Sequence, residues 1–147
     1  MCRKRGVSRL TLLTRPLSTQ EAKLKNPLSL AFVGDTVWDL LTRQQLLISN
    51  AKVNALHRQA VQMVNAGAQA EATDRIESCL TDEEAELFRR GQNAHSRHNA
   101  PKNQDPYAYS RATALETLLG FLYLTGRHER ITELFAIGIS SGGNDHA

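Results

Sequence analysis

Two acidic residues, Asp35 and Glu116, sit among apolar neighbours at helical spacing, where an unpaired charge is costly. A helix would place Asp35 on the core-facing stripe, because its neighbours one turn away are apolar: Ala31, Phe32 and Trp38. Glu116 has a similar environment, with no lysine or arginine four residues further along. Acids in such positions need a hydrogen-bonding partner, an ion pair or a metal ion.

Two unpaired carboxylates on the apolar faces of two helices can meet at one cation, and oxygen ligands of this kind suit Mg²⁺. The alternative is structural. Each carboxylate would then cap a neighbouring helix or pair with an arginine, Arg43 or Arg111. Periodicity alone gives the two interpretations equal weight.

Charge is segregated along the chain. Residues 71–86 hold seven acids and one base, whereas residues 89–111 hold five bases and one acid, a net charge of +4. A basic segment beside an acidic one indicates a surface that binds a polyanion such as a nucleic acid. On charge alone, two solvated faces without a partner are an equally good explanation.

Hydrophobic spacing of 3.6 residues predicts helices over residues 26–48, from about 50 to 64, 68–80, 81–91, 109–124 and 129–139. A break is expected at Gly67, and a loop over residues 91–107, which contain glycine, proline and asparagine but no apolar period. No segment alternates with a period of two. The fold class predicted is therefore all-α.

Composition places one domain at residues 26–140, preceded by a basic segment (1–25) and followed by a polar tail (141–147). Residues 1–20 contain five bases and no acid, which is typical of a flexible nucleic-acid arm or an organellar targeting segment. Cys2 and Cys79 form neither a disulfide framework nor a zinc signature, so a cytoplasmic location is expected. No apolar run reaches the roughly 18 to 20 residues of a membrane span.

Residues 30–37 (LAFVGDTV) resemble the first signature of the ribonuclease III family, with Asp35 at the position of its metal ligand. Residues 112–124 (ATALETLLGFLYL) resemble the second signature, with Glu116 at the second ligand. Residues 90–96 (RGQNAHS) and 101–103 (PKN) resemble a loop of the short branch, Mini-ribonuclease III. Full-length ribonuclease III usually has two further acids where this chain has Ala31 and Thr113, and their absence fits the short branch, which lacks a double-stranded-RNA-binding domain.

The resemblance implies a ribonuclease III-like helical catalytic domain that acts as a homodimer. It implies an endoribonuclease that hydrolyses double-stranded RNA with Mg²⁺, or Mn²⁺ in its place, held by Asp35 and Glu116 as metal ligands and catalytic residues. The substrate implied is the precursor of 23S ribosomal RNA. The leading alternative is a non-catalytic module of the same fold that binds RNA on the ribosome.

RNA contacts are expected from the basic segment, because arginine and lysine neutralise phosphates and polar side chains donate hydrogen bonds to the backbone. The candidates are Arg90, Asn93, Ser96, Arg97, Lys102 and Arg111. A dimer interface is expected on the helix over residues 28–48, whose apolar residues cover more than one face. Two active sites related by a twofold axis would then face opposite strands of a duplex.

Overall fold

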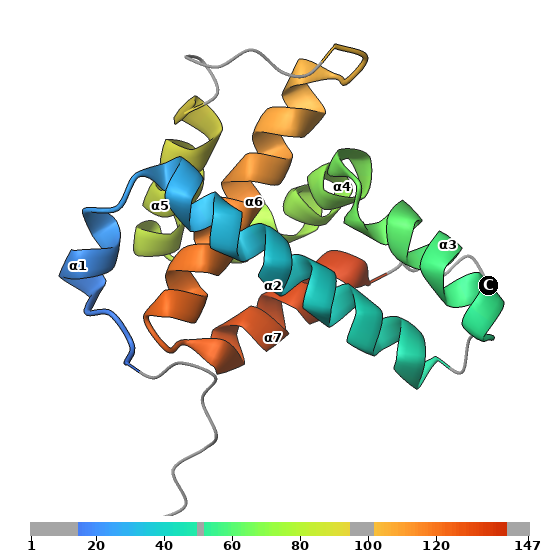
Figure 1. The fold of residues 1–147 in the computed structure, drawn as a ribbon. Helices are drawn as coiled ribbons and strands as arrows, with labels where there is room; N and C mark the ends of the chain where they lie inside the picture. Colours follow the sequence, from blue (N-terminus) through green and yellow to red (C-terminus); the bar gives the residue numbers. More distant parts are fainter. Residues whose placement is uncertain (1–14, 50–51, 95–101, 141–147) are drawn as a thin grey trace, which may run out of the picture.

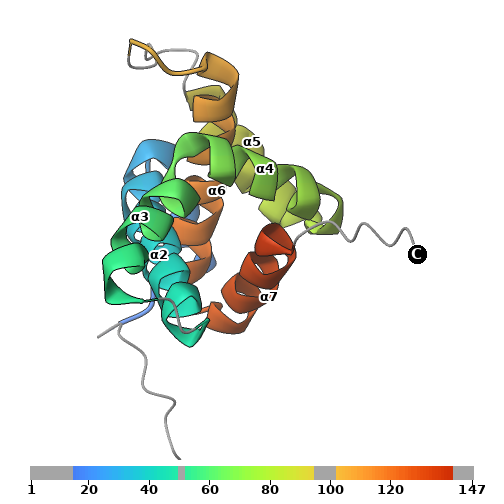
Figure 2. The ribbon, with the colours of Figure 1, turned by 90° about the vertical axis from the view of Figure 1, so that its right-hand side faces the viewer.

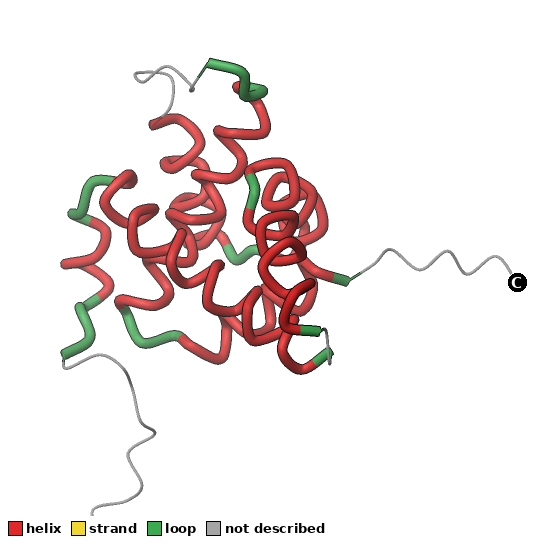
Figure 3. Tube along the Cα trace, turned by 45° about the vertical axis from the view of Figure 1, so that its right-hand side comes forward, coloured by secondary structure: helices red, strands yellow, loops and turns green. Residues whose placement is uncertain are grey.

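The protein is described by a computed structural model, which covers residues 15–49, 52–94 and 102–140. The regular elements in these ranges are α1 (Thr19–Lys23), α2 (Pro27–Ile48), α3 (Val53–Val64), α4 (Ala66–Ile76), the 3₁₀ turn η1 (Glu77–Cys79), α5 (Asp82–Ala94), α6 (Pro106–Leu124) and α7 (His128–Ile139). Figure 3 shows helices and connections over the described residues and no strand. The all-α prediction is confirmed. Within the same ranges, no helix has both the length and the apolar composition that a membrane span requires.

Helix α6 forms the centre of the fold. Its buried side chains lie on all sides of the helix, and five large apolar ones among them are at most 1% exposed: Leu115, Leu118, Leu119, Phe121 and Leu122. A helix that is apolar all round must be covered all round. Helices α2, α4 and α5 provide most of this cover, and α7 packs against α4 and α6 (Figure 1). The side view in Figure 2 shows α3 beside α2, away from the α7 side.

The helix boundaries follow from capping residues. Helix α2 begins after Asn26, whose side chain accepts a hydrogen bond from the Leu28 amide at 2.9 Å. At the start of α5, Thr81 and Glu84 form a capping box, in which each side chain accepts a hydrogen bond from the other residue's amide. Helix α6 ends at Leu124, and Gly126 stops it from continuing, because its φ of 77° lies in the left-handed region that favours glycine. These three boundaries confirm the sequence prediction.

Two other predicted boundaries are wrong. Helix α5 continues through Gly91 to Ala94, because Gly91 serves close packing on α6: a Cβ at this position would lie 2.4 Å from Thr117 Oγ1. The break between α3 and α4 lies at Asn65 and not at Gly67. The Asn65 side chain accepts a hydrogen bond from the Ala68 amide at 2.8 Å, so it caps α4 and ends α3.

The prediction that residues 1–25 stand outside the fold is wrong for residues 15–25. Ser18 caps α1 in a capping box with Glu21, and Ala22 is completely buried. The Leu17 amide donates a hydrogen bond to the Leu124 carbonyl at 2.7 Å, which ties this segment to the end of α6. Residues 1–14 and the predicted tail, residues 141–147, lie outside the described residues.

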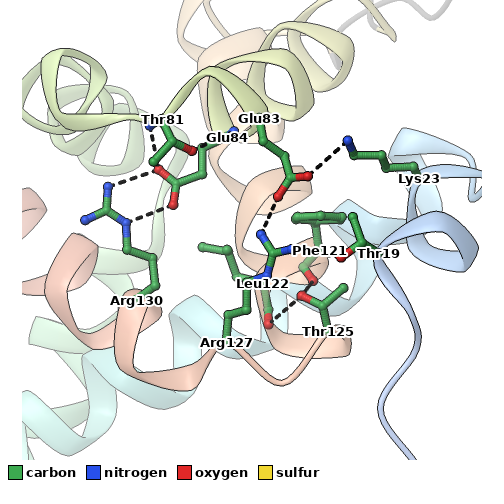
Figure 4. A network of polar contacts seen from close by, with 10 residues as sticks. All are labelled: Thr19, Lys23, Thr81, Glu83, Glu84, Phe121, Leu122, Thr125, Arg127 and Arg130. Atoms are coloured by element: carbon green, nitrogen blue, oxygen red, sulfur yellow. Dashed lines mark hydrogen bonds and ion pairs between the residues drawn. The ribbon is translucent and has the colours of Figure 1, made fainter.

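Charged residues lock α1, α5 and α7 together at the amino end of α5 (Figure 4). Glu83 forms ion pairs with Arg127 and, at 3.0 Å, with Lys23. Glu84 accepts two hydrogen bonds from Arg130, at 2.8 and 3.0 Å, in addition to capping α5. Part of the acidic segment therefore serves internal ion pairs and not a solvated face.

Candidate metal centre

Helices α2 and α6 cross at two glycines. A Cβ built on Gly34 would lie 1.7 Å from the Glu116 carbonyl oxygen, and one built on Gly120 would lie 1.9 Å from the Leu30 carbonyl oxygen. Both obstacles are backbone atoms, which cannot rotate away, so only glycine permits this approach. The Thr117 hydroxyl strengthens the crossing by donating a hydrogen bond to the Pro27 carbonyl at 3.1 Å.

The crossing brings the two predicted acids together. Asp35 follows Gly34 on α2, and Glu116 lies one turn before Gly120 on α6. Their carboxyl groups are near enough for each to act on the other's charge. Burial and, secondly, the charge of Asp35 raise the pKa of Glu116 from 4.5 to about 8. A cation between the carboxylates would favour the charged form of Glu116, which burial and the charge of Asp35 disfavour.

The side chain of Asp35 is more accessible than the sequence indicated. It is exposed, and Phe32, one turn earlier, is 82% exposed, whereas Ala31 and Trp38 are buried. Gly34 makes the contact with α6, and the next residue is rotated by about 100° around the helix, so Asp35 lies at the edge of the contact. The prediction of a core-facing aspartate is wrong, while Glu116 is half-buried.

The arginines proposed as structural partners are engaged elsewhere. Arg43 pairs with Asp39 on its own helix at 3.0 Å. Arg111 pairs with Asp74 at 3.1 Å and with Glu77 at 2.7 Å. Within the described residues, no lysine or arginine pairs with Asp35 or Glu116. The interpretation of these carboxylates as partners of Arg43 or Arg111 is therefore wrong.

A third polar residue, Gln69 of α4, lies at the site and was not found from the sequence. Its side chain is 1% exposed and lies close enough to Glu116 to act on its carboxyl group, whose pKa it tends to lower. A signal was present, because Gln69 lies on the apolar stripe of α4 with three buried residues, Ala72, Thr73 and Ile76, at i+3, i+4 and i+7. A polar residue among buried neighbours at helical spacing is the same pattern that singled out Asp35 and Glu116.

The donor set fits Mg²⁺. Among the described residues no three His, Cys, Asp or Glu side chains gather in a metal-binding group, so protein ligation here rests on two carboxylates. Mg²⁺ commonly binds through one or two carboxylates and keeps several waters or substrate phosphate oxygens. Zinc, by contrast, usually takes three or four protein ligands, with nitrogen or sulfur among them.

Arg111 and Arg90, two of the six residues expected to contact RNA, are held by contacts inside the fold. Arg111 is 3% exposed, pairs with two carboxylates and stacks on the Phe88 ring at 5.0 Å. Arg90 donates hydrogen bonds to the carbonyls of Lys23 at 3.0 Å and Lys25 at 3.3 Å, and so holds the α1–α2 connection. For Arg111 the prediction of a phosphate contact is wrong, because the guanidinium is already buried and neutralised.

The other four candidates belong to the region between α5 and α6. Asn93 lies in the last turn of α5 and Lys102 shortly before α6, and both are exposed. Figure 1 shows the carboxyl end of α5 and the amino end of α6 projecting on the same side of the molecule. Ser96 and Arg97 lie outside the described residues.

Comparisons with known proteins agree with this arrangement. Residues 28–127 match the model of the ribonuclease III domain. The chain is 42% identical over 125 residues to the Mini-ribonuclease 3 of Thermoanaerobacter sp., covering 84% of this chain and 87% of that protein. It is 42% identical over 109 residues to the Mini-ribonuclease 3 of Symbiobacterium thermophilum, covering 74% and 83%.

A crystal structure of a protein from Fusobacterium nucleatum has a similar fold, with a TM-score of 0.71 at 28% sequence identity. The similarity covers 81% of this chain and 95% of that chain. It therefore extends over most of the described helices.

Proposed function

The chain belongs to the ribonuclease III family and is an endoribonuclease, and on that premise we propose that Asp35 and Glu116 hold the Mg²⁺ with which it hydrolyses double-stranded RNA. One observation carries the proposal. Glu116, half-buried beside Asp35, has its pKa raised to about 8, and no basic side chain among the described residues offsets the pair. Two close carboxylates without a cation lower the stability of the folded protein. Such locally unfavourable arrangements are common at functional sites.

The chain's own residues have three tasks in this reaction. Gly34 and Gly120 fix the distance between the two helices, Asp35 offers an accessible carboxylate, and Glu116 supplies a second one from a water-poor position. Mg²⁺ bound there supplies the charge that activates a water and stabilises the departing oxygen. The exposed side of the site, where Asp35 lies, is the side on which the scissile phosphate would approach.

We propose the precursor of 23S ribosomal RNA in the cytoplasm as the substrate, because the chain resembles bacterial Mini-ribonuclease 3 proteins over most of its length. Arg90, Asn93, Ser96, Arg97 and Lys102 remain the proposed RNA contacts. Asn93 and Lys102 are exposed, in the last turn of α5 and shortly before α6. Contacts of such residues with phosphates and sugars would read the shape of A-form RNA more than its sequence.

A duplex-cleavage assay tests this function. We expect the purified protein to cleave a perfect RNA duplex in Mg²⁺ or Mn²⁺, and to lose all cleavage in EDTA. The same strands tested singly are the control and should stay intact. Duplex binding without cleavage in any divalent ion would instead favour the non-catalytic module.

We propose that the protein is a homodimer, supported by an apolar stripe that α2 leaves exposed. Phe32, Leu40 and Leu47 follow one another at helical spacing along α2 and are 82%, 47% and 69% exposed. A row of large apolar side chains in solvent is typical of an interface. Phe32 lies one turn from Asp35, so a partner seated here would put a second active site close to the first.

We therefore predict that Phe32→Glu converts the dimer into a monomer, because the new charge would be buried in the interface without a partner. Val61→Glu is the matched control, since Val61 is 53% exposed on α3, outside the stripe. Sedimentation at micromolar concentration should show a dimer for the unmodified protein and Val61→Glu, and a monomer for Phe32→Glu. A monomeric unmodified protein, or a dimeric Phe32→Glu variant, would contradict the proposed interface.

A further inference from the structure

Gln69 has an unusual set of contacts for a core residue. Its side-chain Oε1 is fully buried and has no hydrogen-bond partner among the described residues. Its Nε2 donates to the Val64 carbonyl at 3.3 Å. The same side chain lies beside the Glu116 carboxyl and favours its charged form, which tends to lower its pKa, so we assign the second Nε2 proton to that carboxylate.

This arrangement is poor as a device for stability. A buried amide oxygen without a partner loses its hydration and regains nothing, and an apolar side chain of similar size would avoid that loss. Thr73, one turn further along α4, shows the ordinary solution, because its hydroxyl donates to the Ala70 carbonyl of its own helix at 2.5 Å. Gln69 instead directs its donor out of its helix, towards a carboxylate.

The anchoring carbonyl is itself well placed. Val64 is the last residue of α3, and α4 begins two residues later with Asn65 as its cap. The Asn65 side chain donates through Nδ2 to the Gln62 carbonyl of α3 at 2.8 Å and accepts through Oδ1 from the Ala68 amide of α4. It therefore ties the two helices together at their junction. Gln69 therefore links Glu116 on α6 to a fixed point between α3 and α4.

We infer that Gln69 is a positioning residue for the metal centre: its buried amide, anchored on Val64, orients the Glu116 carboxylate for a divalent cation shared with Asp35. The inference rests on the proposed function of Asp35 and Glu116. Partners of this kind hold a ligand in its binding rotamer, and losing them typically weakens metal affinity by about 10- to 100-fold. The site has few carboxylates, because no third His, Cys, Asp or Glu joins Asp35 and Glu116 within the described part of the chain, so the orientation of each ligand matters more.

The test replaces Gln69 by methionine, which keeps the length and apolar volume of the side chain but donates no hydrogen bond. Mn²⁺ binding to the full-length protein without RNA is titrated by electron paramagnetic resonance. We expect Gln69→Met to weaken Mn²⁺ binding by about 10- to 100-fold. In the metal-free state its melting temperature should stay within about 5 °C of the unmodified protein. The lost amide donates a hydrogen bond but also buries an unpartnered oxygen, so its removal changes stability little. High Mg²⁺ should restore most of the cleavage rate.

Thr42→Val is the matched control. Thr42 is completely buried on α2, and its hydroxyl oxygen also lacks a hydrogen-bond partner, so the control removes the same kind of group. Its Mn²⁺ affinity should equal that of the unmodified protein. Equal Mn²⁺ affinity in folded Gln69→Met would overturn the positioning role alone, and so would a stability loss without an affinity loss. If the unmodified protein binds no Mn²⁺ and Glu116→Gln binds equally little, the proposed metal site falls, and this inference with it.

Discussion

Replacing Glu116 by glutamine, or Asp35 by asparagine, is expected to reduce duplex cleavage by about 1000-fold or more while the fold stays intact. Each change keeps the shape of the side chain and removes one of the two proposed metal ligands, and a metal held there would supply several kcal/mol of transition-state stabilisation. Cleavage of a labelled duplex under single-turnover conditions measures the rate. Circular dichroism measures the fold, and sedimentation measures the oligomeric state.

Glu86→Gln serves as the control for this pair. Glu86 is an exposed carboxylate on α5 that takes no part in the site, so its variant should cleave at the unmodified rate. Full activity in Glu116→Gln or Asp35→Asn would remove the metal-site hypothesis. Unfolding of both variants, with unchanged specific activity in the folded fraction, would also contradict it.

The same glutamine variant should change how stability depends on pH. Because the pKa of Glu116 rises from 4.5 to about 8 on folding, the folded protein holds a proton there that the unfolded chain has lost. Without metal, the free energy of unfolding should therefore fall as pH rises from about 4.5 to about 8. Glu116→Gln removes this dependence, so its gain in melting temperature over the unmodified protein should be larger at pH 8 than at pH 5.

Replacing Gly34 by alanine is expected to destabilise the protein by about 3 kcal/mol or more, among the largest effects of overpacking. The added Cβ would lie 1.7 Å from the Glu116 carbonyl oxygen, so α2 and α6 must separate. The separation would also pull Asp35 away from Glu116. Urea unfolding measures the loss of stability, and Mn²⁺ binding to the folded fraction measures the damage to the site.

Gly67→Ala is the control for this substitution. Gly67 is exposed near the start of α4, and the one neighbour of an added Cβ is a side-chain atom, Asn65 Oδ1, at 3.3 Å. The variant should be as stable as the unmodified protein or slightly more so, because alanine favours a helix over glycine. A Gly34→Ala variant as stable as Gly67→Ala would mean that the two helices do not cross this closely.

The features predicted correctly from the sequence are those that a local pattern determines. Apolar spacing gave the α2 and α6 helices, and Asn26, Thr81 and Gly126 marked helix ends because capping depends on a few adjacent residues. The same local pattern singled out Asp35 and Glu116 as acids on apolar stripes, but only Glu116 is half-buried, because the exposure of each side chain depends on a tertiary contact. Their role as metal ligands stays a prediction.

The features that were missed depend on contacts between distant segments. The sequence predicts a helix end at Gly91, but this glycine lies inside α5 and packs closely on Thr117 of α6. The sequence predicts a phosphate contact for Arg111, but this arginine pairs with Asp74 and Glu77 of the acidic segment, residues 71–86. The short helix α1 follows the basic start of the chain, where no apolar period predicts a helix, but Ala22 and the Leu17 amide fix it to the core.

The most direct test of the metal centre is the position of a bound ion. Crystals of the protein grown with Mn²⁺ should show an anomalous peak at the metal edge that contacts both the Asp35 and the Glu116 carboxylates. The same peak should be missing from crystals of Glu116→Gln. An anomalous peak elsewhere in a protein that cleaves duplex RNA, with none at these two carboxylates, would contradict the proposed metal centre.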